Sequence, residues 1–212
     1  MSSPLGLEET RKRPRYWMRG PWRRKNFRPR VLLPLTAALV LWCFANPTSA
    51  SLGAGMGLVA CGQALRLWAA GHLVKTDRLT VSGPYRLLRH PLYAGTLLTG
   101  VGLIVAAGNP AARVALPAGL VFFFGYYLPY KERVECSRLE ARWGARFTEY
   151  RASVSPLWPR LGSWRKEPRD PSSWSIERVV ANDEFGVLLA AGLALAAIAA
   201  RGLPTVDALL GL

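Results

Sequence analysis

The stretch GPYRLLRHPLYAG, residues 83–95, places two arginines, a histidine and two tyrosines at the start of an apolar segment. Pro91 is a favourable first residue for a helix, so Arg89 and His90 are expected beside exposed backbone N–H groups, where anions bind. His90 can also accept a proton near neutral pH. This pattern indicates a polar ligand site at the start of an apolar helix.

Further polar side chains are expected near the same place. Gln63 and Arg66 lie three residues apart near the end of an apolar segment, on one helical face, and His72 ends that segment. Tyrosine and glutamate side chains follow the next apolar hairpin, at Tyr127, Tyr130, Glu132 and Glu135. Because a polar group at the edge of hydrocarbon is costly unless it is paired, these residues are candidates for function.

Each candidate also has a simpler structural role. Arg66 can extend its guanidinium to a membrane surface, and Arg86 can be ordinary positive charge on the cytoplasmic side. Glu135 can form an ion pair on a helix surface, because three basic residues lie within four positions of it. These alternatives stay open.

Five apolar segments are candidates for the helices that position these residues. A helix rises 1.5 Å per residue, so about 20 apolar residues cross the roughly 30 Å of hydrocarbon in a bilayer. The candidate segments are 31–49, 52–72, 91–108, 112–130 and 185–200. The residues before the last segment, Asn182, Asp183 and Glu184, are expected to cap its N-terminus and complement its charge.

The charge distribution predicts the orientation of these segments. The chain has 28 Lys and Arg against 13 Asp and Glu, a net charge of +15, although half of its residues are hydrophobic. Basic residues gather in 1–30, 72–91 and 131–183, whereas the connections 46–51 and 108–112 carry no charge. Because basic loops stay in the cytoplasm, we expect a cytoplasmic N-terminus and an external C-terminus.

The basic N-terminal residues are expected to contact anionic lipid rather than nucleic acid, because they adjoin the first apolar segment. A signal peptide has its apolar core much closer to the start of the chain, so none is predicted here. Three cysteines without metal-type spacing predict neither a disulfide framework nor a metal site. The GAGMG run, which starts at Gly53, has no preceding strand and is expected to let helices approach closely.

The predicted fold class is all-α: a polytopic integral membrane protein of about five transmembrane helices, with a cytoplasmic helix and loop region that forms the active site. Residues 131–152 are expected to be helical, with Val134, Leu139, Trp143 and Phe147 on one stripe. Residues 154–174 contain four prolines and are expected to be extended. The predicted parts are a basic arm (1–30), a membrane core (31–160), a Pro-rich linker (161–183) and a C-terminal helix with its tail (184–212).

Residues 62–159 resemble the isoprenylcysteine carboxyl methyltransferase and phospholipid methyltransferase superfamily. The likeness rests on Gly-Pro-Tyr-Arg at 83–86 and Arg-His-Pro-Leu-Tyr-Ala-Gly at 89–95, followed by an apolar hairpin, Glu135 and an aromatic region that ends in Pro. This chain departs from the family pattern at two positions. Cys136 stands where the family has a second glutamate, and Phe147 stands where it has a tyrosine.

The resemblance implies that S-adenosylmethionine binds between the Arg-His-Pro loop and the acidic helix, while a lipophilic acceptor enters from the bilayer. It implies catalytic roles for Arg89, His90 and Glu135. The implied cofactor-binding residues are Tyr85, His90, Pro91, Tyr93, Gly95 and Glu135, and the implied substrate-binding residues are Arg66, Trp68 and His72. An acceptor carboxylate needs no base, whereas an amine or thiol needs His72, His90 or Glu135 to remove a proton.

The implied partners are a lipophilic or prenylated substrate and membrane lipids, without nucleic acid. The implied location is a bacterial inner membrane or an endomembrane. The identity of the acceptor, the choice among O-, N- and S-methylation, and the oligomeric state stay open.

Two other functions are also considered. An NADPH-dependent membrane reductase of the sterol and steroid type shares a related Arg-His-Pro motif, but Leu92 stands where that group favours Asn. A non-catalytic lipid-interaction protein of the same ancestry stays open because of Cys136. Saturable binding of S-adenosylmethionine without NADPH binding distinguishes the methyltransferase from the reductase.

Overall fold

The computed structural model describes residues 39–74, 79–108, 110, 112–159 and 173–203. The chain divides into two compact units, residues 1–39 and 40–212, and every element discussed below belongs to the second. Its described helices are α2 (Ser49–His72), η2 (Gly83–Arg86), α3 (Pro91–Ala107), α4 (Ala112–Phe122), η3 (Phe123–Tyr127), α5 (Leu128–Trp143), α6 (Ala145–Ser153), α7 (Ile176–Ala181) and α8 (Glu184–Arg201).

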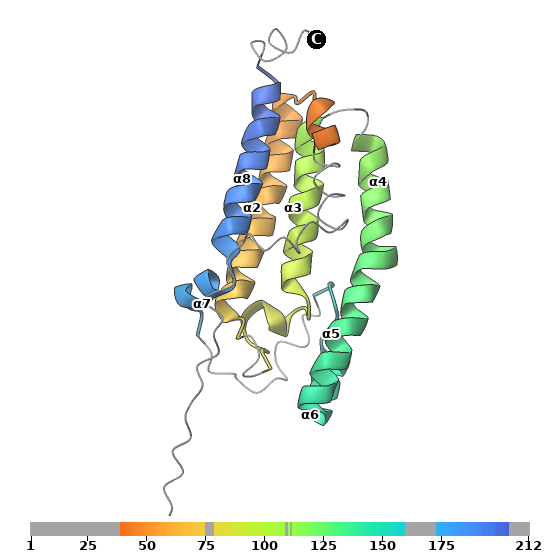
Figure 1. Cartoon of the computed structure of the whole chain (residues 1–212), viewed down its shortest axis with the longest axis vertical. Helices are drawn as coiled ribbons and strands as arrows, with labels where there is room; N and C mark the ends of the chain where they lie inside the picture. The colour runs from red at the N-terminus through yellow and green to blue at the C-terminus, as the bar shows by residue number, and fades with distance from the viewer. Residues whose placement is uncertain (1–38, 75–78, 109, 111, 160–172, 204–212) are drawn as a thin grey trace, which may run out of the picture. The chain divides into compact units, whose positions relative to one another are not determined.

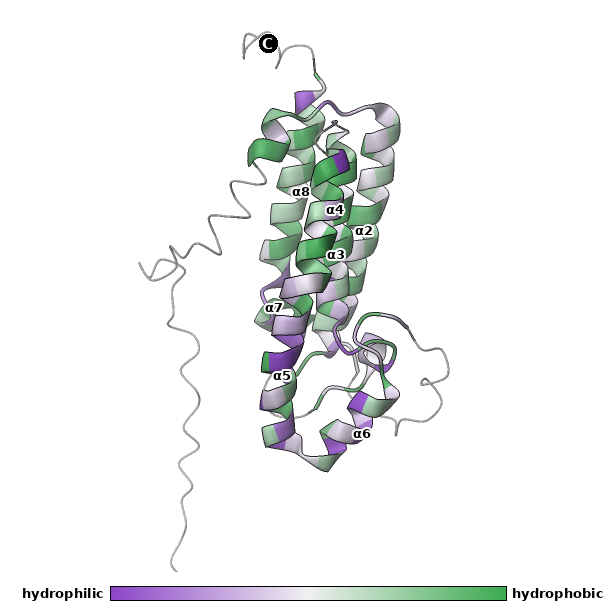
Figure 2. Ribbon diagram, turned by 90° about the vertical axis from the view of Figure 1, so that its right-hand side faces the viewer, coloured by the Kyte–Doolittle hydropathy of each residue, from purple (hydrophilic) through white to green (hydrophobic). Residues whose placement is uncertain are grey.

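The all-α class is confirmed for these described residues. They contain no strand, and their one isolated β-bridge pairs Leu88 with Ser155 in parallel. Figure 2 shows that hydrophobic residues predominate in α2, α3, α4 and α8, whereas hydrophilic residues concentrate in α5 and α6. The polar residues are therefore placed beyond the apolar parts of the helices, as the segregation in the sequence predicts.

Helices α2 and α3 lie side by side because small residues allow close contact of their backbones (Figure 1). A Cβ added to Gly55 would lie 2.5 Å from the carbonyl oxygen of Gly102 and the Cβ of Ala106. Gln63 Nε2 also donates to Thr99 Oγ1 across this interface at 3.0 Å. The predicted packing role of the GAGMG run is confirmed for Gly55, whereas Gly53 and Gly57 face open space.

Helices α4 and α5 form one continuous run, Ala112–Trp143, that is interrupted by a π-helical turn at Phe123–Tyr127. A π turn contains an extra residue and changes the phase of the helix that follows it. The first part of this run has large exposed apolar side chains, among them Val121, Phe122 and Phe124. This part is therefore suited to contact with lipid.

The membrane prediction is confirmed only in part. The run Ala112–Trp143 and helix α8 are long and apolar enough to cross a membrane, while α3 is apolar but shorter. The predicted segments 52–72 and 91–108 are also largely helical, but five spans are not shown. Residues 31–38 of the segment 31–49 lie outside the described residues, and the described part leaves the helical conformation at residues 44–48.

The start of α8 differs from the prediction. Asp183 occupies the N-cap in the left-handed conformation, with φ 60°, and its side chain makes no capping hydrogen bond. Asn182 instead donates from Nδ2 to the carbonyl oxygens of Ala70 and Leu73, at 3.0 and 3.3 Å. Asn182 thus caps the C-terminus of α2. Glu184 lies in the first turn of α8, where its charge complements the helix dipole as expected.

The residues before α8 also bind the end of α2. Trp174 Nε1 donates to the carbonyl oxygen of Leu67 at 3.2 Å, and its ring lies where a Cβ of Gly71 would be. The Gly71 carbonyl accepts from the backbone N–H of Ser175 at 3.0 Å and from Arg178 Nη1 at 3.4 Å. These contacts satisfy the carbonyl groups that a helix leaves unpaired at its C-terminus.

The predicted helix at 131–152 is confirmed, with a break at Gly144. Gly144 adopts φ 51°, which favours glycine, and separates α5 from α6. Phe147, Tyr150 and Val154 then pack with Cys136 and with the segment before η2, through Leu79 and Val81, in one buried cluster. Leu139 and Trp143 pack against this cluster as the predicted stripe requires, but Val134 is exposed.

The predicted extended segment 154–174 is described only at its ends, since residues 160–172 lie outside the described part. Residues 154–159 are not helical, and they pair with the stretch before α3. The backbone N–H of Arg89 donates to the Ser155 carbonyl at 2.8 Å, and that of His90 donates to the Pro156 carbonyl at 3.0 Å. These two N–H groups are therefore paired within the chain, and the anion site expected at the first turn of α3 stays a prediction.

Candidate functional site

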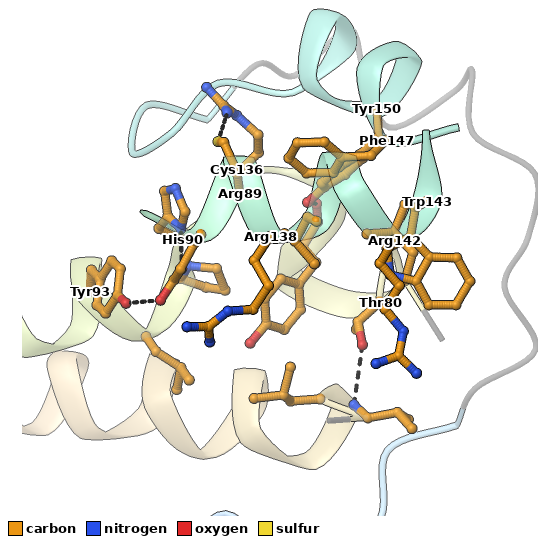
Figure 3. A pocket seen from close by; sticks show the side chains of 18 residues that line it. Thr80, Arg89, His90, Tyr93, Cys136, Arg138, Arg142, Trp143, Phe147 and Tyr150 are labelled. Atoms are coloured by element: carbon orange, nitrogen blue, oxygen red, sulfur yellow. Dashed lines mark hydrogen bonds and ion pairs between the residues drawn. The ribbon is translucent and has the colours of Figure 1, made fainter. Parts of the chain in front are cut away.

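A cavity of about 480 Å³ lies where the end of α2, the start of α3, and helices α5 and α6 meet (Figure 3). This volume is within the range of small-molecule sites, and apolar side chains provide most of the lining. Six residues of the predicted site line the cavity: Tyr85, Arg89, His90, Pro91, Tyr93 and Glu135. Residues from separate parts of the chain thus share one small cavity.

His90 and Glu135 are the central polar pair of this cavity. His90 Nδ1 lies 3.5 Å from Glu135 Oε2, while the hydroxyl of Tyr93 donates a short hydrogen bond to Glu135 Oε1. The rings of His90 and Tyr93 stack with their centroids 5.3 Å apart. Both carboxylate oxygens are therefore oriented by neighbouring groups, and the side chain keeps 37% exposure for a ligand.

His90 is placed by Pro91, which begins α3 as the sequence predicts. The side chain of His90 is only 7% exposed, and burial, which disfavours the charged imidazolium, lowers its pKa below the usual value of 6.5. A carboxylate opposite Nδ1 favours the neutral tautomer with its proton on Nδ1, which leaves a lone pair on Nε2. His90 Nε2 is buried and has no hydrogen-bond partner among the described residues.

Arg89 points away from His90 and is held by several groups. Its Nη2 lies 2.7 Å from Glu132 Oε1, its Nε donates to the carbonyl oxygen of Val154 at 2.9 Å, and its Nη1 lies 3.6 Å from the sulfur of Cys136. The guanidinium therefore fixes α5 and the segment 154–156 to the start of α3. Cys136, which departs from the family pattern, contributes to the buried cluster under the cavity and contacts Arg89 there.

Tyr85 and Tyr150 form a second connection in the wall of the cavity. The hydroxyl of Tyr150 donates to the backbone carbonyl oxygen of Tyr85 at 2.7 Å. Burial raises the pKa of the Tyr85 hydroxyl far above its ordinary value, so this phenol stays neutral. Tyr85 therefore forms part of the cavity wall without adding charge.

Four residues of the predicted site do not line the cavity. Arg66 forms a bidentate ion pair with Glu184, at 3.0 and 2.9 Å, and donates to the carbonyl oxygen of Leu92 at 3.2 Å. His72 contacts Ser82 through Nδ1 at 3.2 Å, and Trp68 is exposed. A Cβ on Gly95 would meet the Arg66 side chain and the backbone of Gly62, so its small size serves the packing of α3 on α2.

Several labelled residues of the cavity wall were not predicted from the sequence as site residues, among them Thr80, Arg138, Arg142, Trp143, Phe147 and Tyr150. From the sequence, Arg138 and Arg142 are interpreted as ordinary positive charge on a helix surface. Their spacing from Glu135, three and then seven residues, places all three on one helical face, and this was the available signal. The sequence gives no comparable signal for Thr80, because this residue lies in an irregular segment. Its hydroxyl accepts a hydrogen bond from the backbone N–H of Val74 at 3.1 Å.

Curated proteins with detectable similarity bear two kinds of name. The cobalt-zinc-cadmium resistance protein CzcN of Cupriavidus metallidurans is 34% identical over 136 residues, which is 63% of this chain and 57% of that protein. Protein-S-isoprenylcysteine O-methyltransferase A of Arabidopsis thaliana is 36% identical over 89 residues, which is 40% of this chain and 43% of that enzyme.

A third relative is the nickel-cobalt-cadmium resistance protein NccN of Alcaligenes xylosoxydans xylosoxydans. It is 31% identical over 139 residues, which is 65% of this chain and 63% of that protein. The chain spans about half the length of the curated relatives it matches. No family model matches the chain, and no solved structure matches it.

These similarities agree with the motif that surrounds His90. The methyltransferase names recur in a second enzyme of Arabidopsis thaliana, at 32% identity, and in rice. The resemblance drawn from the sequence is thereby confirmed, and the chain is a homologue of the protein-S-isoprenylcysteine O-methyltransferases and of the CzcN and NccN resistance proteins.

Proposed function

We propose that the chain is a membrane methyltransferase that uses S-adenosylmethionine to methylate a lipophilic, prenylated acceptor at the cytoplasmic face of a membrane. The observation that carries the proposal is the contact of His90 with Glu135 in the wall of one small cavity. The names of the homologous methyltransferases support the same reaction. The apolar helices next to the cavity support a membrane location.

The residues of the cavity fit the methyl donor. A zwitterionic nucleoside derivative offers ammonium and ribose hydroxyl groups as hydrogen-bond donors, and a carboxylate accepts from both. Glu135 is already oriented by Tyr93 and His90, so less freedom is lost when a ligand binds. The unpartnered Nε2 of His90 is a second acceptor in the same place, and it gains the hydrogen bond it lacks when a donor group binds.

The chemistry needs little from the protein. When bound, the sulfonium group supplies an activated methyl, so the chain's own residues chiefly position the reactants and exclude water. Glu135 and His90 would hold the polar part of the donor, while the aromatic rings of Tyr85 and Tyr93 would enclose it. The backbone pairing of 155–156 with Arg89 and His90 keeps this wall fixed.

His90 is the best placed group if the acceptor must lose a proton. Its neutral imidazole presents Nε2 with no partner among the described residues. His72 is outside the cavity, and both oxygens of Glu135 face other residues. A carboxylate acceptor needs no base, and in that case His90 would act only in binding.

The position of the cavity suits two reactants of opposite solubility. The cavity begins where α3 begins, and α3 is apolar over its whole length. Hydrophilic residues concentrate in α5 and α6 on the other side of the site (Figure 2). We infer that a water-soluble donor reaches the cavity from this polar side, whereas a lipophilic acceptor reaches it from the bilayer.

The test is transfer of a radiolabelled methyl group from S-adenosylmethionine. The full chain in lipid nanodiscs is incubated with a native lipid extract and with a farnesylated N-acetylcysteine, and labelled products are identified. We expect label in a prenylated or other lipophilic product. His90→Ala and Glu135→Ala should each weaken donor binding at least tenfold, because a charge-assisted contact is lost.

Glu140→Ala is the matched control, because Glu140 lies on the same helix, is exposed and does not line the cavity. Its donor binding should equal that of the original chain. Unchanged donor binding in both cavity variants would exclude the proposed site. Saturable NADPH binding without binding of S-adenosylmethionine would favour the reductase instead.

A further inference from the structure

The charges around the cavity are unequally distributed along α5. Glu135 lies beside His90, and Arg138 and Arg142 follow on the same helical face. At 1.5 Å per residue, these arginines begin about 4.5 and 10.5 Å farther along the helix axis. Figure 3 shows both side chains extending from α5 on the side of the cavity. The cavity thus has an acidic end and a basic end.

Other charged groups of the cavity are already neutralised. Arg89 is paired with Glu132 at 2.7 Å, and buried His90 favours its neutral form. By contrast, no carboxylate of the described residues lies within ion-pair distance of Arg138 or Arg142. Arg142 instead makes a cation–π contact with the ring of Trp143, with its guanidinium carbon 5.7 Å from the ring centroid. Two guanidinium groups are therefore available to a ligand.

An ordinary solvated helix surface offers a simpler explanation for arginines on α5. Arg133 and Arg146 have this character, because both are exposed and neither lines the cavity. Arg138 and Arg142 are exposed as well, but they differ in position, since they are one turn apart and both line the cavity. Leu139 and Phe147 lie beside them in the wall, so an ion bound there would be partly shielded from water.

We propose that Arg138 and Arg142 form an oxyanion-binding end of the cavity that binds a ligand carboxylate. The inference rests on the proposed function and assigns the polarity of the site. Guanidinium groups bind carboxylates through two parallel hydrogen bonds, and the opposite end, with Glu135, attracts ammonium or hydroxyl groups. A ligand that carries both kinds of group would fit the cavity in one direction only.

Two ligands of the proposed reaction can supply this carboxylate. One is the amino-acid part of S-adenosylmethionine, and the other is the carboxylate of a prenylated cysteine acceptor. The experiment separates them through matched pairs of ligands, with and without the carboxylate. The variants are Arg138→Gln, Arg142→Gln and the double substitution, with Arg133→Gln as the control on the same helix.

The first arm measures equilibrium binding of S-adenosylmethionine and of its decarboxylated analogue to the full chain in nanodiscs. If the donor supplies the carboxylate, the original chain binds S-adenosylmethionine about tenfold or more tightly than the analogue, in line with a charged hydrogen bond. The double substitution should abolish this preference by weakening only the binding of S-adenosylmethionine. Arg133→Gln should preserve the preference.

The second arm measures the KM for farnesylated N-acetylcysteine and the inhibition constant of its carboxamide. If the acceptor supplies the carboxylate, the double substitution raises the KM about tenfold, while inhibition by the carboxamide and the donor preference stay unchanged. Arg138→Lys with Arg142→Lys should recover part of the loss, because charge is retained without the planar fork.

The two arms together distinguish a failure of this inference from a failure of the proposed function. A change in either ligand pair beyond that of Arg133→Gln supports the oxyanion-binding end and identifies its ligand. If the original chain binds the donor and transfers methyl groups, but neither pair responds to the double substitution, this inference is wrong and the proposed function stands. If the original chain neither binds the donor nor transfers methyl groups, the proposed function fails and the inference fails with it.

Discussion

Arg66 and Glu184 form a bidentate ion pair that joins α2 to the first turn of α8. Arg66 Nε and Nη2 lie 3.0 and 2.9 Å from the two carboxylate oxygens, and the side chains are only 12% and 5% exposed. Arg66 also donates to the carbonyl oxygen of Leu92, directly before Tyr93. The pair therefore holds the first turn of α3 next to the cavity without entering it.

Removal of one partner of this ion pair should lower the stability of the folded protein. Glu184→Ala leaves a buried guanidinium without its carboxylate, and we expect a loss of about 3 kcal/mol in the free energy of unfolding. The double variant Arg66→Met with Glu184→Met should lose less, because no buried charge is left alone. Thermal unfolding in a mild detergent measures both. Equal losses in the two variants would contradict this explanation.

Removal of the Tyr93 hydroxyl tests how Glu135 is oriented. Tyr93→Phe keeps the ring that stacks on His90 but loses the hydrogen bond to Glu135. Donor binding should weaken roughly fivefold, which corresponds to about 1 kcal/mol. Tyr130→Phe is the control, because Tyr130 is exposed and does not line the cavity. The same affinity in both variants would show that the hydroxyl does not matter.

The lowered pKa of His90 predicts an acid-sensitive site. Burial lowers this pKa, and the guanidinium of Arg89 lowers it further, whereas the carboxylate of Glu135 opposes them. Between the ordinary value of about 6.5 and the lowered value, the unfolded chain binds more protons than the folded chain, so stability falls as the pH falls. Stability contributed by the neutral imidazole is complete above about pH 6.5.

The measurement is the unfolding midpoint between pH 5 and pH 8, with His90→Gln as the comparison. The original chain should lose more stability below pH 6.5 than the variant does. Methyl transfer should keep its full rate down to about pH 6.5, since the folded protein holds His90 neutral there. A steeper acid loss in the His90→Gln protein than in the original would overturn this explanation.

The glycines of α2 provide a matched pair for helix packing. Gly55→Ala would place a Cβ 2.5 Å from Ala106 Cβ and from the backbone of Gly102, so α2 and α3 would have to separate, at a cost of about 1–3 kcal/mol. Gly57→Ala meets nothing within 4 Å and should stabilise the helix by up to about 1 kcal/mol. Thermal unfolding of the two variants should shift in opposite directions.

The location of the site was predictable, because its residues occupy helix ends that basic loops place together. His90 and Tyr93 precede and open an apolar helix, and Glu135 follows an apolar hairpin, so their meeting depends only on the direction of the helices. The sequence offered no sign that Arg66 pairs with Glu184, since nothing local specifies a partner so far along the chain. The available interpretation was that a lone arginine in an apolar helix snorkels or binds substrate.

The predicted capping of α8 by Asn182 was wrong for a related reason. Asn182 has the residue type of an N-cap, yet its amide reaches the carbonyl oxygens at the end of α2. The preference of Asn for unpaired backbone groups was correctly recognised, but the choice between two neighbouring helix ends is made by tertiary packing. Arg138 and Arg142 were not predicted, because an arginine on a solvated helix surface and an arginine that lines a cavity have the same sequence pattern. Only the packing of α6 beside α5 distinguishes the two.

The closure of α2 by Trp174, Arg178 and Asn182 has a consequence for biosynthesis. Ribosomes release the chain from its first residue onward, so α2, α3 and α5 emerge well before the residues that satisfy the last carbonyl groups of α2. The pocket wall that continues from α2 through Leu73 and Val74 can reach its final form only after synthesis has passed residue 182. The nascent protein is therefore expected to acquire its ligand-binding ability as one of the last events of maturation.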